Sequence, residues 1–165
     1  GAAGGLLICC VANPLGWFIG AACVQARLIC NLLDGMVAIE GGMKSKTGPI
    51  YNEFPDRIAD TFFLVPLGYA AGEPWLGWAA ALAAALTAYI RVFGGSVGLA
   101  QDFSGVMAKQ RRMAALTAGL VAQSIEWFVS PTHWSLLVTA IVIAAGSLVT
   151  CVTRTSTLAR ALERA

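Results

Sequence analysis

The chain has 165 residues, of which 58% are hydrophobic and only 12% charged, and its mean hydropathy is +0.72. A water-soluble domain of this size could not cover so much apolar surface, so the composition excludes an ordinary soluble fold and predicts an integral membrane protein. The small net charge of +2 and the scatter of basic residues over several connections exclude a nucleic-acid binder. The five cysteines lie in apolar runs without the spacing of metal ligands.

Apolar runs predict five membrane-spanning helices, preceded by a short apolar piece at residues 5–12 that a truncated first helix would explain. A spanning helix needs about 20 mostly apolar residues. The expected spans are 15–38, 50–72, 75–99, 113–129 and 134–152, and Asn13 and Pro14 separate the first of them from the short piece. We therefore expect one all-α bundle of about six transmembrane helices over residues 1–165, with a cytoplasmic tail from about residue 153.

Basic residues lie in three connections that an alternating path puts on the same side of the bundle. By the positive-inside rule that side is cytoplasmic, as for a multi-pass protein of the bacterial inner membrane. The tryptophans fall near the opposite ends of the spans, where an aromatic belt is expected. The basic residues are Lys44, Lys46, Lys109, Arg111, Arg112, Arg154, Arg160 and Arg164, and the tryptophans are Trp17, Trp75, Trp78, Trp127 and Trp134.

Acidic and amide side chains gather at the cytoplasmic ends of the first two full spans. Asn31 and Asp34 are one helical turn apart, and Asn52, Asp56 and Asp60 recur every four residues, so each set shares one face of its helix. Ionisable residues inside a membrane are costly and usually face a bundle interior or a wet cavity. The two sets are expected to converge, because a short connection joins their helices.

Two interpretations of this cluster remain open. Carboxylates that crowd together need a compensating cation, and oxygen ligands without His or Cys favour Mg²⁺, Mn²⁺ or Ca²⁺. The alternative is a network of interfacial salt bridges with Arg57 and Lys46.

The cluster resembles the signature of the CDP-alcohol phosphotransferase family, D-x-x-D-G-x-x-A-R, a short loop, and G-x-x-x-D-x-x-x-D. The signature region, residues 31–60, consists of NLLDGMVAI, EGGMKSKT and GPIYNEFPDRIAD. It agrees with the family in DG-x-x-A, in the loop length and in D-x-x-A-D. It departs from the family at Asn31, where the first Asp is expected, and at Ile39, where the Arg is expected.

Two registers of the second half are possible. An ungapped match through Gly48 puts Asn52 and Asp56 at the last two Asp positions, whereas the D-x-x-A-D match puts Asp56 and Asp60 there. The sequence favours the second register, since one extra helical turn keeps the same face.

The resemblance implies transfer of a phosphatidyl group from a CDP-linked lipid, such as CDP-diacylglycerol, to a small polar alcohol, with release of CMP. It also implies Mg²⁺ or Mn²⁺ as the cofactor and Asp60 as the general base. The implied metal site contains Asp34, Asp56 and Asp60, with Asn31 and Asn52 beside them. Gly35, Ala38 and Gly48 are expected at the nucleotide.

Basic residues of the later helices are candidates for binding substrate phosphates. Arg91 lies near the cytoplasmic end of its span, and Arg111 and Arg112 begin the next one. Their guanidinium groups suit a phosphate, but they equally suit the membrane interface and its anionic lipid heads.

Two other functions stay open from the sequence. A cation-coupled transporter would place polar groups near the bilayer midplane on several helices, whereas here they gather at one face. An inactive family relative, acting as a binding or assembly partner, is suggested by Asn31 and Ile39. The expected partners are membrane lipids and, from the small-residue helix faces and the resemblance, a second copy in a homodimer.

Overall fold

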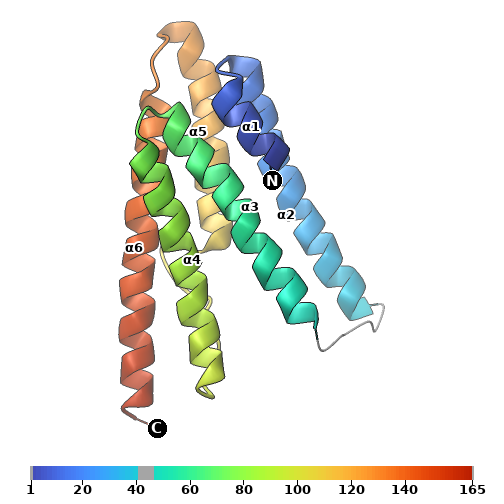
Figure 1. The fold of residues 1–165 in the computed structure, drawn as a ribbon, viewed down its shortest axis with the longest axis vertical. Helices are drawn as coiled ribbons and strands as arrows, with labels where there is room; N and C mark the ends of the chain where they lie inside the picture. The colour runs from blue at the N-terminus through green and yellow to red at the C-terminus, as the bar shows by residue number, and fades with distance from the viewer. Residues whose placement is uncertain (1, 41–46, 165) are drawn as a thin grey trace.

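The computed structural model describes residues 2–40 and 47–164, without the side chains of residues 7, 9, 34, 35, 38–40, 49, 51 and 52. The described residues form helices and connections with no strand, and the helices run up and down in one bundle (Figure 1). This confirms the predicted all-α fold of six helices. They are α1 (Ala2–Cys10), α2 (Pro14–Glu40), α3 (Gly48–Ala70), α4 (Pro74–Ser96), α5 (Lys109–Val129) and α6 (Trp134–Leu162).

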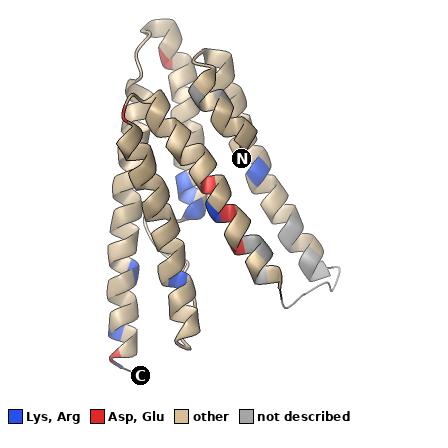
Figure 2. Cartoon of the chain, in the orientation of Figure 1, with Lys and Arg blue, Asp and Glu red and all other residues tan. Residues whose placement is uncertain are grey.

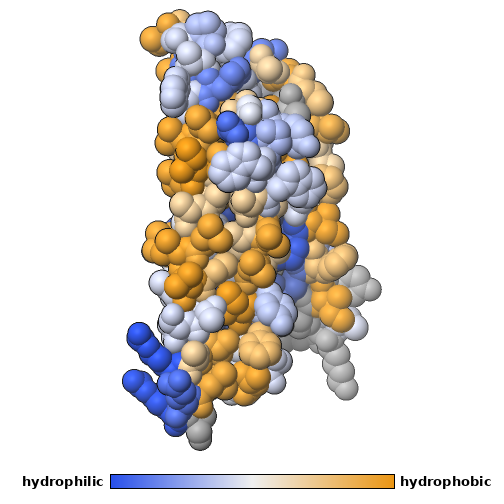
Figure 3. All heavy atoms as spheres, turned by 60° about the vertical axis from the view of Figure 1, so that its left-hand side comes forward, coloured by the Kyte–Doolittle hydropathy of each residue, from blue (hydrophilic) through white to orange (hydrophobic). Residues whose placement is uncertain are grey.

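Three of the described helices are long and apolar enough to cross a membrane: Pro14–Leu33 within α2, all of α4 and all of α6. Their outer faces carry large apolar side chains, and Figure 3 shows such side chains covering much of one face of the molecule. Apolar side chains that face outward along a helix suit contact with lipid acyl chains. The composition and the helices thus agree on a membrane protein.

Local sequence signals set the helix boundaries. The break between α1 and α2 lies at Asn13, whose Oδ1 accepts a hydrogen bond of 2.8 Å from the backbone N–H of Gly16. Pro14 follows as the first residue of α2, where its missing N–H costs nothing. At the other end of the chain, residues 153–162, expected as part of a tail, continue α6 to Leu162.

Small residues let the helices approach closely. Ala80, Ala83 and Ala84 are almost fully buried in α4, which packs against α3 and α6. Gly119 of α5 faces Thr139 of α6, and a Cβ at residue 119 would lie 2.0 Å from the Thr139 hydroxyl oxygen. Close packing of this kind holds membrane helices together where lipid offers no hydrophobic drive.

The expected aromatic belt is wrong for Trp17. Its side chain is fully buried, with its ring 5.5 Å from that of Trp127 and 5.9 Å from that of His133. The start of α2 and the end of α5 meet here, so the indole packs in the interior of the bundle and does not lie at the membrane interface. Trp75 and Trp134 are exposed, as the belt requires.

The described charges are unevenly distributed along the bundle. Figure 2 shows the basic residues from the middle of the bundle to the end that contains the C-terminus. At the other end, the charged side chains among the described residues are all acidic. The helix α5 begins well inside the bundle (Figure 1). The start of α5 can therefore meet the acidic residues of α3 inside the bundle.

The contact between Gly119 and Thr139 predicts a loss of stability when residue 119 gains a methyl group. Gly119→Ala should lower the free energy of unfolding by about 1–3 kcal/mol, because the helices must move apart. Thermal unfolding in detergent measures this. Gly94→Ala is the matched control, since a Cβ there meets only the flexible end of Leu158 at 3.4 Å; equal loss in both variants would contradict the prediction.

Candidate functional site

Asn31 of α2 and Asp56 of α3 meet where the two antiparallel helices face each other. The Asn31 side-chain amide donates a hydrogen bond of 2.9 Å to Oδ1 of Asp56. This confirms that the two polar faces converge at this pair. The side chains of Asp34, Gly35, Ala38 and Asn52, which belong to the same expected site, lie outside the described part of the chain.

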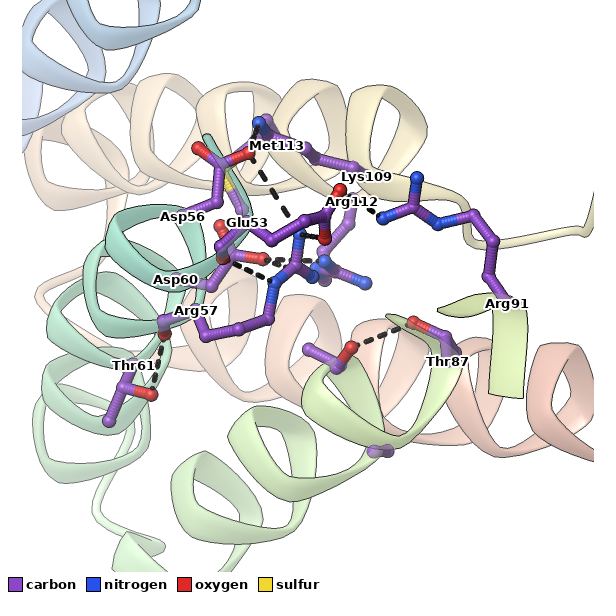
Figure 4. A network of polar contacts seen from close by, with 12 residues as sticks. Glu53, Asp56, Arg57, Asp60, Thr61, Thr87, Arg91, Lys109, Arg112 and Met113 are labelled. Atoms are coloured by element: carbon purple, nitrogen blue, oxygen red, sulfur yellow. Dashed lines mark hydrogen bonds and ion pairs between the residues drawn. The ribbon is translucent and has the colours of Figure 1, made fainter. Parts of the chain in front are cut away.

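Asp56 also has three basic partners, of which Arg57 is the most distant, at 3.9 Å. Arg27, one turn before Asn31 in α2, donates to Oδ1 of Asp56 at 3.0 Å and to its backbone carbonyl at 3.1 Å. Lys109, the first residue of α5, forms an ion pair with the other carboxylate oxygen (Figure 4). The Asp56 side chain keeps 17% of its surface exposed. Its negative charge is thus balanced by basic side chains, while the carboxylate stays accessible to solvent.

Asp60, one turn further along α3, is more deeply buried. It is 2% exposed, and its Oδ2 accepts a hydrogen bond of 2.6 Å from Arg112 of α5 (Figure 4). Arg27 lies 3.0 Å from its other oxygen. A charge out of water needs such partners, since burial of an isolated carboxylate is very costly. Asp60 therefore joins α2, α3 and α5.

Glu53 and Arg91 form the outer edge of the same network. Arg91 of α4 pairs with the Glu53 carboxylate at 2.5 Å and lies 4.7 Å from the centre of the Phe103 ring. Arg57 lies 3.6 Å from Glu53, on the preceding turn of α3. The pair of Glu53 and Arg91 joins α3 to α4. The contact of Arg91 with Phe103 joins α4 to the connection that leads into α5.

The connection 97–108 is fixed to α6 by hydrogen bonds. Arg154 of α6 donates to the carbonyl oxygens of Ser104 at 2.8 Å and Thr87 at 2.7 Å, and the Thr150 hydroxyl accepts from the Met107 N–H at 2.9 Å. Gly105 adopts a φ of 137°, where a side chain would be strained. These contacts set the start of α5, and hence the positions of its basic residues.

A cavity of about 330 Å³ opens beside these residues. Its walls carry five basic side chains and two acidic ones, so an anion is favoured there. Asp56 lies on the wall, whereas Asp60 does not. The charged residues of the wall are Arg57, Arg91, Lys109, Arg112, Arg154, Glu53 and Asp56.

The remaining predicted residues lie in different places. Arg111 is exposed, is not on the cavity wall, and donates to the Gly105 carbonyl at 3.2 Å. Gly48 begins α3. Sequence reasoning missed Arg27 altogether, although an arginine in an apolar span, four residues before Asn31 and so on the same helix face, was a usable signal.

The described residues do not fit a divalent cation in addition to these ion pairs. Asp56 pairs with Arg27 and Lys109, Asp60 pairs with Arg27 and Arg112, and Arg57 lies 3.9 Å from both carboxylates. Within the described part of the chain, no group of three or more His, Cys, Asp or Glu side chains could hold a metal. The site thus combines the two sequence interpretations, with the ligand types of a metal site and the contacts of a salt-bridge network.

Comparisons with known proteins identify the fold. No protein-family model and no curated protein matches the chain. Two structures of the phosphatidylinositol phosphate synthase PgsA1 of Mycobacterium tuberculosis do. Each is 22% identical with a TM-score of 0.76 and covers 94% of this chain; the structure with manganese and citrate is covered over 77% of its length, and that with CDP-DAG over 80%. The chain therefore has the fold of this synthase.

The buried pair of Asp60 and Arg112 predicts a large structural effect of one mutation. Arg112→Met should lower the free energy of unfolding by about 3 kcal/mol or more, because it leaves the Asp60 charge without its closest partner. Thermal unfolding in detergent measures the loss. Arg111→Met, at the neighbouring exposed position, should change stability by less than about 0.5 kcal/mol; similar losses in the two variants would show that the pair is not structural.

Proposed function

We propose that this protein is a membrane phosphotransferase of the CDP-alcohol phosphotransferase type. It moves a phosphatidyl group from a CDP-linked lipid to a small polar alcohol and releases CMP. The observation that carries the proposal is the basic cavity beside Asp56, at the end of the helices that hold the signature. The shared fold supports it, because the related synthase was crystallised with CDP-DAG bound.

Basic residues of the cavity suit the phosphates of the donor. Lys109 and Arg57 lie on the wall near Asp56, and Arg91 and Arg154 lie on the wall that α4 and α6 contribute. Guanidinium groups bind phosphate oxygens in pairs, and an ammonium group binds them as a point charge. An acceptor alcohol that carries a negative charge would bind to the same basic side chains.

Asp56 suits the general base better than Asp60, which the sequence register favoured. A base must come within hydrogen-bond reach of the hydroxyl it deprotonates. Asp56 lies on the cavity wall, whereas Asp60 is buried against Arg112 and Arg27. The contact of Asp56 with Asn31 also favours the ungapped register, in which these residues are the last and the first members of the signature.

The proposed step is a displacement at phosphorus. The acceptor hydroxyl gives its proton to the Asp56 carboxylate, and its oxygen forms a new bond to the phosphorus of the phosphatidyl group. The bond from that phosphorus to the bridging oxygen breaks, and CMP leaves with this oxygen. Lys109 must leave Asp56 for the carboxylate to accept the proton, and as a residue of the cavity wall it is available to the leaving phosphate instead.

A divalent cation, Mg²⁺ or Mn²⁺, belongs to the proposal because the related synthase structure contains manganese. When bound, such an ion neutralises phosphate charge and stabilises a leaving phosphate. Asp34 and Asp56 are the carboxylates expected to hold it, with Asn31 and Asn52 beside them. No step is assigned to the ion, since Asp56 already has basic partners.

The proposal also includes a membrane orientation and a homodimer, the latter expected from the small-residue helix faces. The basic half of the bundle, which contains the cavity, would face the cytoplasm under the positive-inside rule, in a bacterial inner membrane. The nucleotide headgroup of a CDP-linked lipid in the cytoplasmic leaflet could then reach the cavity beside Asp56.

Binding of the nucleotide lipid without turnover is a second candidate function. It is favoured by Asn31, which supplies an amide where the family has a carboxylate, and by the basic partners of Asp56. Such a protein would bind CDP-diacylglycerol and release no CMP.

The transfer predicts CMP release that depends on Asp56. Purified protein with CDP-diacylglycerol, Mn²⁺ and a polyol, an amino alcohol or a sugar phosphate should release CMP, measured by chromatography. Asp56→Asn should lower kcat by about 100-fold or more, as for loss of a general base. Arg160→Met, at an exposed position near the end of α6, is the control.

Three results separate the alternatives. Binding of CDP-diacylglycerol without CMP release, for every acceptor, would favour the second candidate function. No binding at all would contradict both functions. An unchanged rate in Asp56→Asn, with loss in a folded Asp60→Asn protein, would return the base to Asp60.

A further inference from the structure

We propose that Lys109 takes the place of a divalent cation at Asp56 and excludes the ion until a phosphate-bearing ligand draws the lysine away. The nucleotide lipid as that ligand rests on the proposed function. The exclusion itself rests only on the residues around Asp56.

The first support is the set of contacts that Asp56 makes. Lys109 pairs with one carboxylate oxygen, and the other accepts hydrogen bonds from Arg27 and Asn31. The contact atom of Asn31 is its amide nitrogen, so this side chain presents a donor to Asp56. These three donors occupy three of the about four lone-pair positions of the carboxylate, so an ion that binds through more than one of them must displace a donor.

The second support is the charge of the surroundings. The cavity wall has five basic and two acidic side chains, so a cation with two charges is repelled from it. A diphosphate reverses this balance because it brings its own negative charges into the cavity. The ion would then be attracted to the phosphates and to Asp56 together.

The third support is that Lys109 is the basic partner most able to move. Its side chain is 28% exposed, against 23% for Arg57, which lies 3.9 Å from Asp56, and 9% for Arg27. Arg27 and Arg112 are also tied to Asp60, which needs them. Lys109 has a flexible stem and lies on the cavity wall, so an incoming phosphate can take it from Asp56 without disturbing the buried pair.

The test measures Mn²⁺ binding to the full chain in detergent, by calorimetry, without nucleotide. Lys109→Met should bind Mn²⁺ at least tenfold more tightly than the unmodified protein. Asn31→Asp, which replaces a donor with a carboxylate, should also bind Mn²⁺ more tightly. Arg160→Met removes the same charge far from the cavity and should behave like the unmodified protein.

An unmodified protein that binds Mn²⁺ as tightly as Lys109→Met would overturn the exclusion by Lys109. So would an equal gain in Arg160→Met, because the effect would then be one of net charge. Circular dichroism of each variant confirms that it is folded before titration.

A second titration tests the release of Lys109 by a phosphate-bearing ligand. CDP should raise the Mn²⁺ affinity of the unmodified protein at least tenfold, after correction for Mn²⁺ bound by free CDP, and should raise that of Lys109→Met much less. Equal gains in both proteins would overturn the release. Failure of CDP to bind any variant would contradict the proposed function, while the titration without nucleotide still decides the exclusion.

Discussion

The charge of Asp60 must be balanced inside a helical bundle, and the arrangement of three helices follows from that requirement. The carboxylate is 2% exposed and contacts Arg112 of α5 and Arg27 of α2. The free-energy cost of removing two charges from water is offset only when the partners are close and well oriented. The helices α2, α3 and α5 must therefore come together at this level, and α5 must begin inside the bundle for Arg112 to reach.

The connection 97–108 makes that start of α5 possible. Arg154 and Thr150 of α6 hold it at Ser104 and Met107, and the same geometry brings Lys109 to Asp56, one turn from Asp60 along α3. Two carboxylates on one helix face thus have different environments. Asp60 is enclosed by Arg112 and Arg27, whereas Asp56 lies on the cavity wall.

A cavity with more basic than acidic groups also changes which ligand the residues of the signature region favour. In the sequence, the aspartates and amides indicated a site for a divalent cation. In the structure, the three acidic side chains described at the start of α3, Glu53, Asp56 and Asp60, all have arginine or lysine partners, which favours an anion beside them. A phosphate-bearing ligand is the chemical class that can use both the basic wall and a carboxylate beside it.

The sequence by itself determined the helices, their number and the polar face of each signature helix. Apolar run length, Pro14 and the spacing of Asn31, Asp56 and Asp60 are local properties, and local spacing sets which residues share a helix face. The meeting of Asn31 with Asp56 also followed, because a short connection forces neighbouring helices to be antiparallel.

Only the tertiary structure decided the partners. Arg27 contacts Asp56 and Asp60 from another helix, Lys109 reaches Asp56 across 53 positions of sequence, and Trp17 is buried by Trp127 and His133. Spacing along one helix cannot specify the rotation and depth at which another helix packs against it. These depend on packing between segments distant in sequence, such as Gly119 against Thr139, and they determine which aspartate is buried and which one faces the cavity.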